Sequence, residues 1–111
     1  YDFEHCQIHL IDLDLYRRGP FTNDMGRLFG STRFMAPEEF EHGATIDERT
    51  TVFTMGRTVQ LFVDCEMDVH VDMCRDLLDV AERACQTHPT DRWPRMADFY
   101  AAWRQAAASV Y

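Results

Sequence analysis

Two aspartates near the start of the chain, Asp12 and Asp14, follow a short apolar run and are candidates for metal chemistry. The run at residues 8–11 predicts the end of a strand, which would fix the backbone of Asp12 while its carboxylate faces a cleft. Mg²⁺ suits that arrangement, because it is a hard ion that takes one or two protein carboxylates and completes its octahedron with phosphate oxygens and water. Taken alone, the pair is more often a polar turn that ends a strand. The magnesium interpretation therefore depends on the residues downstream.

A second group, residues 30–38, reads Gly-Ser-Thr-Arg-Phe-Met-Ala-Pro-Glu. Its small residues predict a turn. Pro37 suits the first turn of a helix, and Glu38 and Glu39 suit the positive end of that helix's dipole. The group therefore predicts a turn followed by a short helix.

In this order the two groups resemble the activation segment of a protein kinase. In that family an Asp at the end of a short strand holds the nucleotide's magnesium, and an Ala-Pro-Glu begins the closing helix. The resemblance implies that Asp12 binds Mg²⁺ and that Gly30 and Ser31 line the site of the substrate hydroxyl. It also implies ATP as the phosphoryl donor and a protein as the substrate.

Two later stretches keep the family's order. Residues 52–56 read Val-Phe-Thr-Met-Gly and resemble the family's long central helix, although Thr51 stands where the family has an Asp that braces the catalytic loop. Residues 84–93 resemble a late segment of the family, whose Arg pairs with the Glu of Ala-Pro-Glu. The resemblance therefore implies a buried, bidentate ion pair between Glu38 and Arg92. Without that context, Arg92 would be expected to be a solvated loop residue.

The expected fold class is mainly α, a partial kinase-like C-terminal lobe with a short β element at the N-terminus. Residues 7–12 predict a strand, 16–33 a loop, 37–42 a short helix and 50–63 a longer, buried helix. Two further apolar stripes recur at three- and four-residue steps, as helices do. They comprise Met73, Leu77, Val80, Ala81 and Ala84, and then Met96, Phe99, Tyr100, Trp103 and Ala107.

The chain is expected to be a single partial domain, 1–111, because a kinase-like fold needs roughly twice its 111 residues. It contains no lysine, no glycine-rich loop and no catalytic loop ahead of Asp12. We therefore expect the catalytic base, the ATP-binding Lys and the second metal ligand upstream of Tyr1, and no activity from these residues alone.

Composition argues against some classes of protein. A net charge of −8 argues against a nucleic-acid surface, and no apolar run approaches the roughly 20 residues of a membrane span. Residues 1–4 lack the basic start of a signal peptide, so we expect a cytoplasmic protein and leave the oligomeric state open. The four cysteines show no CxxC spacing and are expected to be free thiols. A zinc site of Cys65, His70 and Cys74 is disfavoured, because structural zinc uses two close ligand pairs.

Three functions stay open. An ATP-dependent protein Ser/Thr kinase ranks first. A non-catalytic, kinase-like interaction module ranks second, because Asp14 replaces the Gly of the metal-binding motif and Thr51 replaces the bracing Asp. A small-molecule phosphotransferase of the same superfamily ranks third, since those relatives generally lack a Gly-Ser turn followed by Ala-Pro-Glu. Neither the substrate nor regulation by phosphorylation follows from the sequence.

Overall fold

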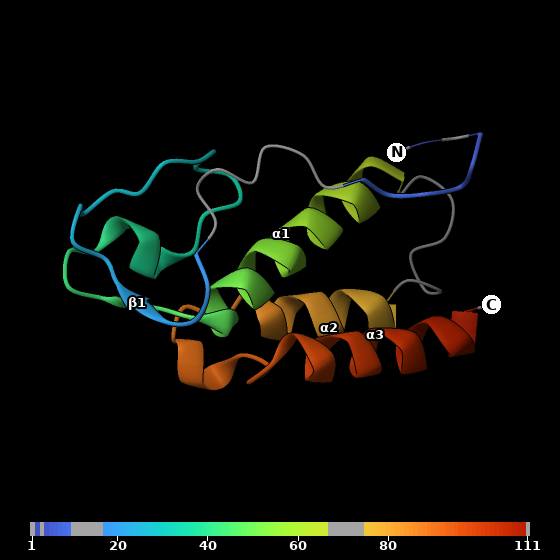
Figure 1. Ribbon diagram of the computed structural model, residues 1–111. Coiled ribbons are helices and arrows are strands. Elements are labelled where there is room, and N and C mark those ends of the chain that lie inside the picture. The colour runs from blue at the N-terminus through green and yellow to red at the C-terminus, as the bar shows by residue number, and fades with distance from the viewer. Residues whose placement is uncertain (1, 3, 10–16, 67–74, 111) are drawn as a thin grey trace.

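The computed structural model describes residues 2, 4–9, 17–66 and 75–110 (Figure 1). In chain order its elements are strand β1 (Phe21–Thr22), the 3₁₀ helix η1 (Pro37–Phe40), strand β2 (Thr45–Ile46), helices α1 (Glu48–Glu66) and α2 (Arg75–Ala84), the 3₁₀ helix η2 (Pro89–Asp91) and helix α3 (Met96–Val110). The described part of the chain is therefore mainly helical with a small antiparallel sheet, which confirms the coarse fold class.

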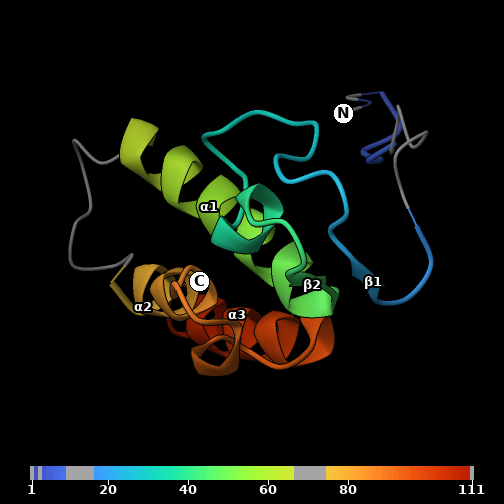
Figure 2. The ribbon, with the colours of Figure 1, turned by 90° about the vertical axis from the view of Figure 1, so that its left-hand side faces the viewer.

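Helix α1 lies between two parts of the molecule. Helices α2 and α3 run side by side along one side of it, and the loop of residues 24–36 with η1 lies on the opposite side (Figures 1 and 2). The core between the helices is built on Val52, Ala84 and Phe99, all of them buried. Partly buried apolar side chains pack around this cluster: Val59, Val80, Trp93 and Met96. The described residues of the apolar stripes predicted for α2 and α3 therefore face the core, except Tyr100, which is 59% exposed.

Helix α1 begins two residues before the predicted start, because Asp47 caps it. The Asp47 carboxylate accepts a hydrogen bond from the backbone N–H of Arg49 at 2.9 Å, which satisfies one of the free N–H groups of the first turn. In the same turn Glu48 accepts the backbone N–H of Met96 at 2.8 Å, so the first turn of α1 also holds the first residue of α3.

Other local predictions need correction. The predicted loop at residues 16–33 contains β1, which pairs with β2 through Phe21 opposite Ile46. The helix predicted at 37–42 is a 3₁₀ helix that ends at Phe40. Within the strand predicted at 7–12, Gln7 forms an isolated bridge with Asp2, and residues 10–12 lie outside the described part. Met73 of the first apolar stripe also lies outside it.

At Gly56, α1 packs tightly against the C-terminal end of α2. A Cβ at Gly56 would lie 2.7 Å from the Ala84 Cβ, 2.8 Å from the Cys85 Sγ and 3.0 Å from the Ala81 carbonyl oxygen. Burial raises the pKa of Cys85 to about 11, so its neutral thiol acts here as a small apolar side chain. Packing, rather than backbone conformation, therefore requires glycine at this position.

We predict that Gly56→Ala destabilises the chain by about 1–3 kcal/mol, because the added methyl group overpacks the helix contact. At an unpacked helical site the same change would stabilise by about 1 kcal/mol, so the sign is informative. Urea unfolding followed by circular dichroism measures it. Thr51→Ala, at an exposed position of the same helix, is the control and should change stability by less than about 0.5 kcal/mol. A Gly56→Ala variant as stable as the parent would contradict the packing described.

Candidate functional site

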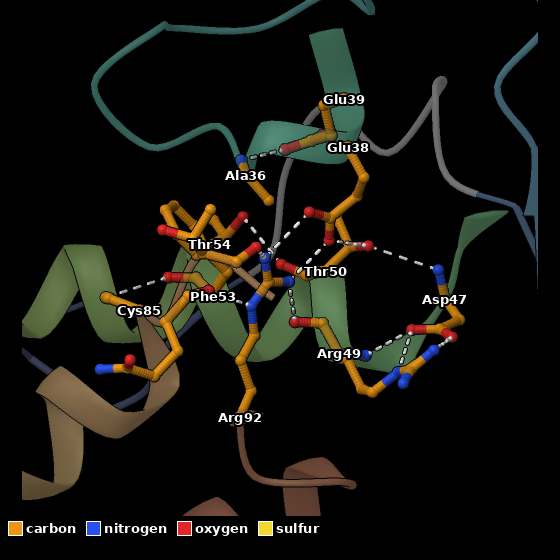
Figure 3. Close-up of polar contacts among 12 residues, drawn as sticks. Ala36, Glu38, Glu39, Asp47, Arg49, Thr50, Phe53, Thr54, Cys85 and Arg92 are labelled. Atoms are coloured by element: carbon orange, nitrogen blue, oxygen red, sulfur yellow. Dashed lines mark hydrogen bonds and ion pairs between the residues drawn. The ribbon is translucent and has the colours of Figure 1, made fainter. Parts of the chain in front are cut away.

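Glu38 and Arg92 form a buried, bidentate ion pair (Figure 3). Arg92 Nη1 donates to Glu38 Oε1 at 2.6 Å, and Nη2 donates to Oε2 at 2.9 Å. The two side chains are 0% and 7% exposed, although the residues are 54 positions apart in the chain. The structure thus forms the ion pair that was predicted from the motif order.

The guanidinium of Arg92 is satisfied on every edge. Its Nε donates to the Gln86 carbonyl at 2.7 Å, Nη1 also donates to the Arg49 carbonyl at 3.1 Å, and Nη2 to the Thr87 carbonyl at 3.2 Å. Its carbon lies 4.9 Å from the centre of the Phe53 ring, at cation–π distance. Arg92 therefore joins η1, the first turns of α1 and the link that follows α2 (Figure 3).

The two neighbouring glutamates of η1 have opposite environments. Burial disfavours the Glu38 carboxylate, but hydrogen bonds from Arg92, the backbone and Thr50 outweigh it and hold its pKa below the usual range. The Thr50 hydroxyl donates at 2.8 Å. Burial raises the pKa of Glu39, whose carboxylate accepts a hydrogen bond from the Ala36 backbone N–H at 2.7 Å. At neutral pH Glu38 is therefore ionised and serves as the anionic half of the pair.

Asn23 is a second anchor that the sequence analysis did not identify. The residue is fully buried, and its side-chain Nδ2 donates to the Glu38 carbonyl at 3.1 Å while Oδ1 accepts the Gly26 backbone N–H at 3.1 Å. Its own backbone N–H donates to the Ala44 carbonyl at 2.8 Å. An Asn three residues before a Gly is typical of a side-chain-closed turn, which was the available signal, but the contact with η1 has no local signature.

Gly30 and Ser31 lie on an exposed turn within the loop of residues 24–36. The turn is closed by the Phe34 backbone N–H, which donates to the Ser31 carbonyl at 3.0 Å. Gly30 has a φ of +153°, and a Cβ there would lie 3.3 Å from both Cγ and Sδ of Met35, so glycine fits this position best. Their proposed contact with a substrate hydroxyl stays a prediction.

The metal prediction falls on residues that the structure does not describe. Asp12 and Asp14 lie outside the described ranges, as do His70 and Cys74 of the disfavoured zinc set. Across residues 2, 4–9, 17–66 and 75–110, no three His, Cys, Asp or Glu side chains gather as metal ligands. In the same ranges no helix is both long enough and apolar enough to cross a bilayer.

A broad pocket of about 1020 Å³ opens beside η1 and the start of α1. Its lining combines apolar side chains from the loop with polar groups of α1 and η1, among them Phe21, Met25, Phe29, Glu39 and Thr51. Thr51, at the position where the kinase resemblance would expect a bracing Asp, is thus an exposed residue of the pocket wall.

Comparison of the chain with protein-family models, with curated proteins and with solved structures found no match. The function of the chain must therefore be inferred from its own residues and geometry.

We predict strong coupling between Glu38 and Arg92 in a double-mutant cycle with methionine at each position. Each single variant should lose about 3–5 kcal/mol of unfolding free energy, because it strands a buried charge. Arg92→Met should cost more than Glu38→Met, since it also removes a donor from three carbonyl oxygens. The double variant should lose less than the two single losses together. Urea unfolding at neutral pH, with sucrose added to keep weak variants folded, measures all four chains.

The exposed pair Arg95–Asp98, with an N···O distance of 3.0 Å, provides the control cycle. Its coupling should stay below about 1 kcal/mol, because water screens both charges. Equal coupling in the two cycles would show that burial does not strengthen the Glu38–Arg92 pair.

Proposed function

We propose that the chain forms the activation segment and helical lobe of an ATP-dependent protein Ser/Thr kinase, which transfers the γ-phosphoryl of ATP to a protein hydroxyl. The observation that carries this proposal is the buried Glu38–Arg92 pair. Nothing local brings together residues 54 positions apart, and the order of the kinase-like motifs was the reason to expect their contact.

The arrangement around the pair supports the same function. The chain from η1 back to the exposed turn at Gly30 and Ser31 lies on one side of α1, and α2 and α3, whose connecting segment carries Arg92, lie on the other (Figure 2). The segment is held firmly at η1 and exposed at its turn. This suits a segment that must present a substrate hydroxyl in a fixed position, since phosphoryl transfer depends chiefly on positioning and electrostatics.

In this proposal Asp12 holds Mg²⁺, and Gly30 and Ser31 receive the substrate. The magnesium ion, when bound, neutralises charge on the phosphates of ATP. The proposal requires the catalytic base and the ATP-binding Lys to come from residues upstream of Tyr1. The pocket beside Thr51 is consistent with this requirement, because the resemblance puts the catalytic loop next to that position.

One observation favours a non-catalytic kinase-like module as the second candidate. Thr51 has no carboxylate, and the two acidic residues just before α1 and at its start are already engaged. Asp47 binds the Arg49 guanidinium at 2.8 Å, and Glu48 accepts the Met96 backbone N–H. A catalytic loop would therefore be braced more weakly here than in the family, which would suit a module that binds partners without transferring phosphate.

We predict that Asp12→Asn, in the protein that joins these residues to a nucleotide-binding lobe, lowers phosphoryl transfer by at least about a hundredfold. The neutral amide holds the metal more weakly in the transition state, whereas the fold should persist. Transfer from radiolabelled ATP to a protein substrate measures the effect. Glu41→Gln removes an exposed carboxylate just after η1, outside the pocket lining, and should leave turnover unchanged.

Turnover that survives Asp12→Asn would contradict the metal assignment. A parent protein that neither binds ATP nor transfers phosphate would instead favour the non-catalytic module. The coding sequence upstream of Tyr1 discriminates independently, because an Asp followed five residues later by Asn, together with a strand Lys, is typical of the enzyme.

A further inference from the structure

Two guanidinium groups hold the exposed turn at residues 30–33 from either side. Arg27 donates from Nη2 to the Gly30 carbonyl and from Nη1 to the Leu28 carbonyl, both at 3.2 Å. Arg57, which comes from α1, donates from Nε to the Arg33 carbonyl at 3.2 Å. The backbone at each end of the turn is therefore bonded to an arginine side chain.

This turn carries unbalanced positive charge. Among the described residues the arginines in ion pairs with a carboxylate are Arg49, Arg92 and Arg95, and no carboxylate lies within ion-pair distance of those around the turn. Arg33 itself is exposed. Within the part of the chain that the structure describes, three guanidinium groups at one short turn thus have no carboxylate partner, in a chain whose net charge is −8. The three are Arg27, Arg33 and Arg57.

We propose that this turn recognises an acidic peptide, in which Asp or Glu residues flank a Ser or Thr. The inference rests on the proposed function, because it takes Gly30 and Ser31 as the site of the substrate hydroxyl. Guanidinium groups bind carboxylates through paired N–H donors. Arg27 and Arg57 keep further N–H groups for this, beyond their bonds to the backbone and the bond of Arg57 Nη1 to the Gln60 side-chain oxygen at 2.8 Å. Arg33 offers its whole side chain.

The overall charge favours a short acidic peptide over a long polyanion. A nucleic acid would extend beyond the turn onto a surface that carries many more carboxylates than arginines, where repulsion opposes binding. A peptide of a few residues contacts the turn alone, so local attraction to the three arginines can exceed the repulsion of the whole chain.

The test is fluorescence anisotropy with the 111-residue chain and a fluorescein-labelled peptide, Ala-Asp-Asp-Ser-Asp-Asp-Ala. The matched control peptide has Asn in place of each Asp. We expect the acidic peptide to bind about tenfold more tightly at low ionic strength, despite the net charge of the chain, and to lose that advantage as salt is added. Equal binding of the two peptides would overturn the inference.

Two charge-reversal variants locate the site. Arg33→Glu should weaken binding of the acidic peptide by about tenfold, whereas Arg104→Glu, an equal charge change at an exposed position of α3, should weaken it less than about twofold. Circular dichroism checks that both variants fold. Equal losses in the two variants would overturn the inference, as would displacement of the peptide by an equal concentration of inorganic phosphate. Binding needs no ATP, so a failure of the kinase assay leaves this result unaffected.

Discussion

The bond between Glu38 and Arg92 is the constraint on which the rest of the described structure depends. Arg92 accounts for five hydrogen bonds that reach η1, the start of α1 and the link after α2. A guanidinium and a carboxylate so thoroughly removed from water are stable only when each satisfies the other, because a lone buried charge costs several kcal/mol. The pair therefore ties together three segments that lie far apart in the sequence.

The loop before η1 depends on that anchor in turn. Asn23 bonds the Glu38 backbone from one side, and Arg57 of α1 holds the far turn at Arg33. The result is a segment whose end at η1 is buried and whose turn at residues 30–33 is exposed. The proposed kinase function requires both properties, since the turn must be accessible to a substrate yet fixed in position. In the proposed account the arginines around the turn are available to bind an acidic peptide, whereas the buried guanidinium of Arg92 serves the fold.

The sequence predicted the helices and the ion pair for different reasons. Periodic apolar residues indicated the two later helices, because each buries one face against a core that includes Ala84 and Phe99. The pair came from motif order alone, as its partners share no local pattern. Asp47 is a residue type that commonly caps helices, so the sequence contained a signal for the start of α1. The two-residue strands and the contact of Asn23 with η1 had none, because they depend on chain segments that only the tertiary fold brings together. The magnesium prediction at Asp12 stays a prediction, since that residue lies outside the described ranges.

The most direct test of this account is side-chain nitrogen NMR of Arg92 in the 111-residue chain. A guanidinium locked between Glu38 and three carbonyls should rotate slowly, so its two Nη groups should give separate signals with protons that exchange slowly with water. These signals should merge or broaden in a Glu38→Gln variant. A single averaged Nη signal in the parent chain, like that of an exposed arginine, would contradict the buried pair and with it the central claim.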